Sequence, residues 1–247
     1  MKSIMSIRKL INKGRSKFYN KVTSYTFMKY SVLLVLIGYI LLLIIGVIVA
    51  ALFDPDGYTI WNNWISDLGS SDHTPAPILY DIACIIAGSM TLPLTFYMEN
   101  LLAPLPYYDK TLLRKQHFSR LRFRLSSFAF LFSIIGNFGY IGVGIFSADR
   151  NYSFLSILGE GPHDIMSYLA FGGFTFGAFF MGWLIVLYQT KIPKILGIYG
   201  ILGPLITAIL NLIYSTPLLE WFLLFSILLW IIPLSLLVLY KPGLIPR

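Results

Sequence analysis

Acidic and histidine side chains gather in two stretches of this sequence, residues 54–81 and residues 149–164. Carboxylate and imidazole groups can ligate a divalent metal or transfer protons near neutral pH. The catalytic candidates are Asp67, His163 and Asp164, and the candidate metal ligands are Asp67, His73, Asp81 and His163. The sequence contains no His-x-x-x-His pair. No cofactor is therefore predicted, and a divalent metal remains an alternative.

A structural interpretation is also open for these residues. His163 and Asp164 follow Pro162, and proline favours the first position of a helix while an acid favours its first turn. The pair is either a helix start that hydrogen-bonds to neighbouring loops or a His–carboxylate catalytic pair. Ser66 precedes Asp67, and it is either a nucleophile or a cap, as serine in a turn often is.

Polar and small residues recur inside long apolar stretches, where each polar group needs a partner or a role. They follow one another at intervals of three or four residues in two series, Asp81, Cys84, Gly88, Thr91 and Thr95, and Ser133, Asn137, Tyr140 and Gly144. Residues at this spacing share one face of a helix. Such a face either packs closely on a neighbouring helix or contributes to a cavity, which would be lined by the second to fifth spans.

The residues predicted to bind a ligand are Asp81, Asn137, Arg150 and Asn211. Asn211 lies in a further polar series with Gly200, Pro204 and Thr207. Arg150 follows Asp149. Its guanidinium either pairs with a carboxylate or holds an anion such as a lipid phosphate, which arginine binds well in bidentate geometry. Asn151 begins an N-glycosylation sequon in the same loop.

The elements that must position these residues are membrane-spanning helices. Apolar residues make up 57% of the 247-residue chain and charged residues only 12%, which is far from the composition of a soluble domain. The apolar residues fall in six runs that are long enough to cross a bilayer. We therefore predict an all-α membrane bundle with spans at about 30–53, 77–98, 125–147, 163–189, 195–215 and 221–240.

Basic residues set the expected orientation. Every Lys and Arg except Arg150 lies in residues 1–29, in the loops that follow the second and fourth spans, or in the C-terminal tail. Basic loops stay on the cytoplasmic side, so both termini are predicted to be cytoplasmic in the plasma membrane. Residues 1–29 are either a basic amphipathic helix or a disordered tail, and residues 110–124 form a second basic segment. Both segments are expected to meet anionic lipids of the inner leaflet, and the +8 net charge does not indicate a nucleic-acid partner.

Two segments together resemble the domain-of-unknown-function family 998, which consists of six-span prokaryotic membrane proteins. The first is Ile65-Ser66-Asp67-Leu68-Gly69 followed by Pro77, and the second is Gly142-Val143-Gly144-Ile145-Phe146 followed by His163-Asp164. A looser likeness is to the Frag/DRAM/Sfk membrane group, which look like modulators of lipid distribution or trafficking. The resemblance implies six helices and draws attention to Asp67, Gly69 and His163, but it implies no activity.

Three functions are consistent with the sequence. The first is a non-catalytic module that binds or senses a lipid or an anion, with an acidic, histidine-containing outward face. The second is a membrane-embedded lipid hydrolase or transferase with an outward metal or His–Asp site. The third is a small transporter or channel. The sequence specifies neither the ligand nor an oligomeric state.

Overall fold

The computed structural model describes residues 17–102, 113–147, 149 and 161–240, and its description of side chains resumes at residue 120 in the second range. Within these residues the chain is helical, with short turns and no strand. The segments 1–16, 110–112 and 150–160 lie outside the described residues, so Arg150, Asn151 and most of the predicted basic N-terminal helix are not placed.

Six helices are long and apolar enough to cross a membrane, as the sequence predicted. They are Tyr25–Phe53, Ile78–Leu102, Arg120–Ile145, Pro162–Leu187, Lys194–Tyr214 and Pro217–Tyr240. The first begins at Tyr25 rather than at residue 30, because the Ser24 side chain caps it by accepting from the Phe27 amide. Residues 17–22 form a short helix before this cap. Its Tyr19 hydroxyl donates to Glu99 Oε2 at 2.8 Å, so it is held against the second span.

The first span consists of three consecutive elements. Helix α2 (Tyr25–Leu34) passes into a single π-helical turn, η1 (Val35–Tyr39), which continues as α3 (Ile40–Phe53). A 3₁₀ helix, η2 (Ile65–Gly69), lies in the following loop. The remaining helices are α4 (Ile78–Leu102), α5 (Leu113–Ile145), α6 (Pro162–Leu187), α7 (Lys194–Tyr214) and α8 (Pro217–Tyr240).

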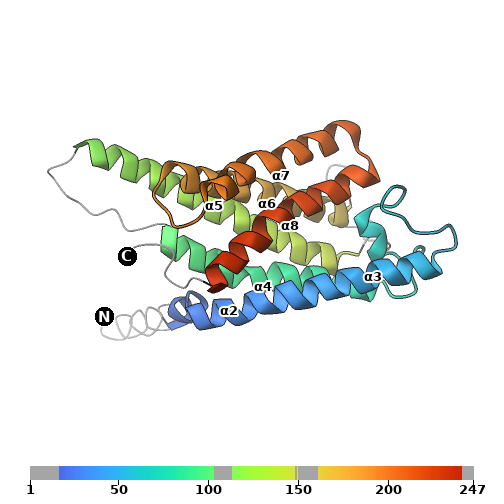
Figure 1. Cartoon of the computed structure of the whole chain (residues 1–247). Helices are drawn as coiled ribbons and strands as arrows, with labels where there is room; N and C mark the ends of the chain where they lie inside the picture. The colour runs from blue at the N-terminus through green and yellow to red at the C-terminus, as the bar shows by residue number, and fades with distance from the viewer. Residues whose placement is uncertain (1–16, 103–112, 148, 150–160, 241–247) are drawn as a thin grey trace, which may run out of the picture.

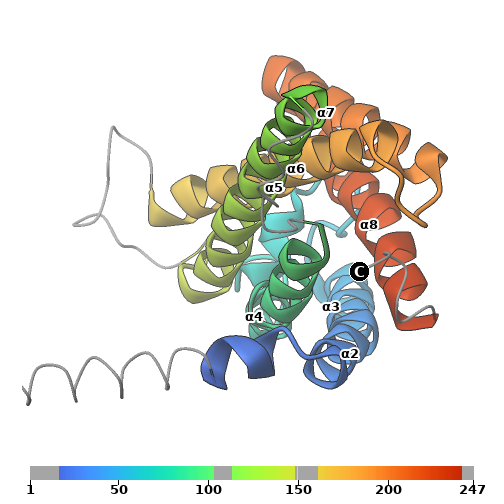
Figure 2. The ribbon, with the colours of Figure 1, turned by 90° about the vertical axis from the view of Figure 1, so that its left-hand side faces the viewer.

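Each span packs chiefly against the next one in the chain. The most extensive contact is between α5 and α6, followed by α4 with α5, α6 with α7, and α7 with α8. The series curls around, so that α8 also contacts α6 and approaches the first span from the other side (Figure 2). The first span, α4, α5, α6 and α8 therefore surround a central space, while α7 packs outside it against α6 and α8. The wall between α8 and the first span is the least packed.

Different segments of the chain lie at the two ends of the bundle. The terminal end holds the start of α2 and the end of α8, where the Tyr25 hydroxyl donates to the Leu239 carbonyl at 2.7 Å. The opposite end is covered by residues 54–76, which we call the cap (Figure 1). The buried apolar residues form two clusters, one around Met98, Leu184 and Leu234 and one around Tyr39, Ile65 and Ala83.

Small residues allow the helix backbones to approach closely. A methyl group added to Gly173 of α6 would lie 2.3 Å from the Gly136 nitrogen of α5. One added to Gly88 of α4 would lie 2.6 Å from the Asn137 carbonyl oxygen. The polar series predicted on the second and third spans thus meet each other, and Gly173 and Gly177 of the fourth span pack against the third. Close packing by small residues is how helices associate in the absence of a hydrophobic driving force.

Candidate functional site: a mid-depth cavity beneath a hydrogen-bonded cap

The cap is bound to the ends of two helices by hydrogen bonds. The Ile65 amide donates to Glu220 Oε2 of α8 at 2.9 Å, and the Trp221 indole donates to the Asn63 carbonyl at 3.1 Å. Ser147, just after α5, donates to the Gly69 carbonyl at 2.5 Å. Because these partners come from spans that are distant in sequence, the cap ties the ends of α5 and α8 together.

Acidic side chains of the cap region serve backbone and histidine donors. Asp67 Oδ2 accepts the Trp64 amide at 2.8 Å, which closes the first turn of η2. His73 Nδ1 lies 2.9 Å from Asp54 Oδ2. Asp149 Oδ2 accepts both the amide and the hydroxyl of Ser71, at 2.9 and 2.8 Å. These candidates for acid–base chemistry are thus used as structural acceptors.

The pKa values of these acids shift in opposite directions. Burial raises the pKa of Asp67, although the Trp64 amide partly opposes this. The Asp56 amide, and then His73, lower the pKa of Asp54, and the Ser71 amide lowers the pKa of Asp149. The contacts of Asp54 and Asp149 therefore stabilise the cap at pH values above 3.8, the ordinary pKa of an aspartate carboxyl. This stabilisation is lost as the pH falls through the lowered pKa values of the two residues.

We expect Glu220→Ala to loosen the cap. The Ile65 amide would lose its acceptor in a half-buried site, and an unsatisfied donor there costs about 1–3 kcal/mol. Hydrogen exchange at Ile65 should then become roughly tenfold faster in detergent-solubilised protein. Asp72→Ala is the control, because no side-chain hydrogen bond of Asp72 is present in the described structure. Equal exchange rates in the two variants would contradict the proposed anchoring by α8.

His163 and Asp164 form a helix start. His163 Nδ1 lies 2.7 Å from the Phe146 carbonyl oxygen at the end of α5, and Asp164 Oδ2 accepts the Gly161 amide at 3.3 Å. His163 Nε2 is buried without a hydrogen-bond partner in the described part of the chain. No described carboxylate is hydrogen-bonded to this imidazole, so the arrangement favours the helix-start interpretation over a His–carboxylate pair.

Asp81 lies beneath the cap rather than at interfacial water. Its exposed fraction is 2%, and a methyl group added to Gly69 would lie 3.3 Å from its Oδ1. The structure thus brings Asp81 close to Gly69 of η2, while His73 is engaged by Asp54. Among the described residues there is no group of three or more His, Cys, Asp or Glu side chains placed to hold a metal ion.

Asn137 joins α4 to α5 at mid-depth. Its Nδ2 donates to Thr95 Oγ1 at 3.2 Å and to the Ser133 carbonyl at 2.8 Å, and its Oδ1 accepts from the Thr91 hydroxyl. The residue is fully buried. Asn211, by contrast, has a buried Oδ1 without a partner in the described structure. The two asparagines predicted to bind a ligand therefore differ: one is an interhelical connection, and the other is not.

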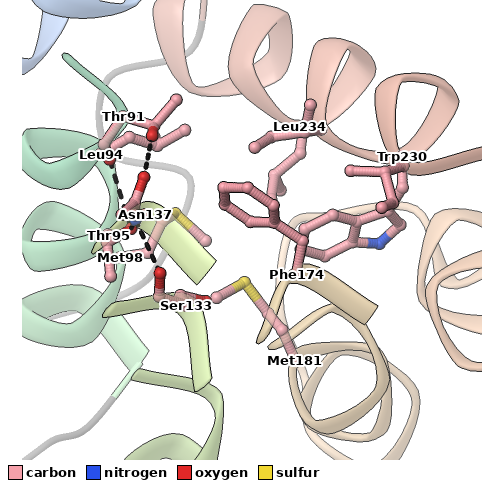
Figure 3. A pocket seen from close by; sticks show the side chains of 12 residues that line it. Thr91, Leu94, Thr95, Met98, Ser133, Asn137, Phe174, Met181, Trp230 and Leu234 are labelled. Atoms are coloured by element: carbon pink, nitrogen blue, oxygen red, sulfur yellow. Dashed lines mark hydrogen bonds between the residues drawn. The ribbon is translucent and has the colours of Figure 1, made fainter. Parts of the chain in front are cut away.

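A cavity lies beside the Asn137 connection. The cavity is small, with about 30 Å³ of free space. Thr91, Thr95, Ser133 and Asn137 form one wall, and apolar side chains of α6 and α8, among them Phe174, Trp230 and Leu234, form the wall opposite (Figure 3). The cavity thus has a short polar wall that faces an apolar one.

Two further recesses extend this cavity toward the first span. Thr91 and Ile231 line all three spaces, and Tyr39 lines the two that extend it. The expectation of a cavity lined by the second to fifth spans is thus corrected: α7, the fifth span, contributes no residue to these spaces, whereas the first and sixth spans do. An apolar cavity-lining side chain has the same sequence signature as one that faces lipid, so sequence reasoning missed both spans.

Helical irregularities flank the cavity on both sides. The π-helical turn η1 provides Val35, Leu36 and Tyr39 to its lining, and such turns are rare and frequent at functional sites. On the other side, Pro233 interrupts the hydrogen bonding of α8 next to Ile231. Tyr39 also makes a 2.7 Å hydroxyl–hydroxyl hydrogen bond with Tyr140 of α5. Sequence reasoning did not identify the π-helical turn, because no proline or glycine pair marks it.

The space between α8 and the first span is closed at its two ends. At the terminal end Tyr25 bonds to Leu239, and at the capped end Glu220 and Trp221 hold the cap. Between these ends α8 packs against α7 and α6, with no comparable packing against α2 or η1 in the described residues. We call the apolar opening between them, lined by Val35, Leu36, Leu228, Ile231 and Ile232, the window.

The fold and composition place the chain in the class of multi-pass helical membrane proteins. No family model, no curated protein and no solved structure matches it. The resemblance to family 998 therefore stays a prediction that depends on its two motifs.

Proposed function

We propose that this protein is a non-catalytic membrane protein that binds a hydrocarbon chain of a lipid in its mid-depth cavity. The chain would enter laterally from the bilayer through the window between η1 and α8. The observation that carries this proposal is the position of the cavity, which is lined mostly by apolar side chains and lies beside the least packed pair of spans. Small-molecule sites are concave, mostly apolar and supplied with a few polar groups, and this cavity has those properties.

The proposal includes an orientation. The terminal end of the bundle would face the cytoplasm of a plasma-membrane protein, since Lys17, Lys21, Arg120, Arg122 and Lys191 all lie near that end. Anionic inner-leaflet lipids would meet these cations. The cap, with its acidic residues, would face outward, and its acids disfavour an anion there. These acids therefore favour lipid binding inside the bundle over binding at the outer face.

Ile231→Phe tests the proposal because Ile231 lines all three connected spaces. The probe is a lipid with a photoactivatable group at mid-chain, reconstituted with the protein in vesicles. We expect wild-type protein to be labelled on Thr91 or Leu94, which do not face the bilayer. We expect the larger side chain to reduce this labelling by about tenfold, as loss of roughly 1.4 kcal/mol of binding would.

Leu229→Phe is the matched control, because Leu229 lies on the same helix but is 63% exposed. It should leave labelling of Thr91 and Leu94 unchanged. Leu228→Phe, which fills the window from a neighbouring position, serves if the first variant does not fold. Labelling of wild-type protein only at residues that face the bilayer would contradict the proposal.

A further inference from the structure

We infer that the lipid bound in the cavity has an uncharged polar end, of which a hydroxyl or carbonyl oxygen meets the Ser133 hydroxyl. This inference rests on the proposed function and specifies its ligand class. Neutral glycerides and prenyl quinones are two sources of the same chemistry, namely an uncharged oxygen group attached to long hydrocarbon.

The first argument is the absence of charge from the cavity. Every residue that lines the three connected spaces is uncharged. An ionised group in such surroundings would lose its hydration without gaining a partner, which is expensive in the interior of a membrane. A phospholipid headgroup is therefore excluded from the cavity, although its hydrocarbon chain is not. Hydroxyl and carbonyl groups have a much smaller desolvation cost, and one hydrogen bond offsets much of it.

The second argument is the state of the polar wall. Both hydrogens of the Asn137 amide and its oxygen are engaged by α4 and α5. The Thr91 hydroxyl lies 2.7 Å from the Ala87 carbonyl, besides its contact with Asn137. Ser133 differs, because its side chain lines the cavity and its hydroxyl makes no hydrogen bond in the described structure. It therefore retains a donor and acceptors for a ligand.

The position of Ser133 also limits where the ligand's polar end lies. Its Oγ is held against Gly177 of α6, where an added methyl group would lie 2.7 Å away. Across the cavity stand the apolar side chains of Phe174, Trp230 and Leu234 (Figure 3). A ligand oxygen at Ser133 would thus leave its hydrocarbon portion directed toward these side chains and the window. The Trp230 indole Nε1 is a second buried donor without a partner in the described structure, but it lies against Gly200 of α7. The free Ser133 hydroxyl beside this largely apolar wall fits an amphiphile with one uncharged polar end.

The experiment compares two probes, a diacylglycerol and a phosphatidic acid, in vesicles that contain the whole protein. Both carry the same photoactivatable group beside the glycerol rather than at mid-chain, because the hydrocarbon chain of either lipid can enter the cavity. We expect the diacylglycerol to label Thr91 or Leu94 and the phosphatidic acid to label these residues much less. Ser133→Ala should weaken diacylglycerol labelling about three- to tenfold, as the loss of one neutral hydrogen bond would. Ser127→Ala is the matched control, since Ser127 lies on the same helix and its hydroxyl already donates a hydrogen bond to the Phe123 carbonyl.

Competition separates the two sources of the ligand. Unlabelled dioleoylglycerol and an unlabelled prenyl quinone are added in separate series, and the stronger competitor identifies the source. Equal labelling by diacylglycerol and phosphatidic acid, or an unchanged Ser133→Ala variant, would overturn the inference while leaving the proposed function intact. Absence of labelling at Thr91 and Leu94 by the mid-chain probe would instead overturn the proposed function.

Discussion

Gly173→Ala should lower the stability of the protein more than any other single methyl addition that we consider. The new methyl group would lie 2.3 Å from the nitrogen and 2.5 Å from the Cα of Gly136. Both are backbone atoms, so α5 and α6 must separate, and these two helices share the most extensive contact of the bundle. Overpacking of this kind costs about 1–3 kcal/mol, which corresponds to a Tm lower by roughly 2–12 °C in a chain of this size.

The adjacent glycine provides the control for this prediction. A methyl group added to Gly172 would have no atom within 4 Å, and alanine is preferred over glycine inside a helix by roughly 0.5–1 kcal/mol. Gly172→Ala should therefore leave the Tm unchanged or raise it slightly. Thermal unfolding of both variants in the same detergent, followed by size-exclusion chromatography, measures the difference. Equal losses would show that the close approach of α5 and α6 does not limit stability.

Asn137→Ala should produce the second large effect. The substitution removes the hydrogen bonds to Thr91, Thr95 and the Ser133 carbonyl in a fully buried position, and it leaves a void. Interhelical hydrogen bonds in membrane proteins contribute about 0.6–1.7 kcal/mol each, so a total loss of about 1–3 kcal/mol is expected. The hydroxyls of Thr91 and Thr95 can still donate to carbonyls of their own helix, which keeps the loss within this range.

Asn211→Ala is the control for the second prediction. Its Oδ1 is buried without a partner in the described structure, so its removal should cost little and relieves an unsatisfied group. Stability of the two variants is compared by thermal unfolding under identical conditions. A loss at Asn211 as large as that at Asn137 would mean that side-chain volume, rather than hydrogen bonding, sets the effect.

The sequence alone was sufficient for the number and approximate positions of the spans. Length and apolar content are local properties, and each of the six runs is long enough to cross a bilayer. The spacing of Asp81, Thr91 and Asn137 was also sufficient to predict buried polar faces, because a helix repeats every 3.6 residues. The ends of the spans were less accurate, since caps such as Ser24 depend on the local backbone.

Only the tertiary structure decided which partners meet. Two of the catalytic candidates contact backbone groups: Asp67 accepts the Trp64 amide, and His163 lies against the Phe146 carbonyl. Glu220, which was not among the predicted site residues, accepts the Ile65 amide from across the bundle. These pairings depend on how loops fold back over helices, and neither local periodicity nor composition determines that path.

The cavity, too, was determined partly by the sequence and partly by the tertiary packing. Sequence spacing identified its polar wall of Thr91, Thr95, Ser133 and Asn137, because polar groups inside a span stand out against apolar neighbours. It could not identify the contributions of η1 and α8, because side chains such as Leu36 and Ile231 would be equally suited to face lipid. Whether an apolar residue faces the bilayer or a cavity is set by the packing of neighbouring helices. The hydrophobic runs thus determined that the chain forms a membrane bundle, and the tertiary packing decided where that bundle leaves space for a ligand.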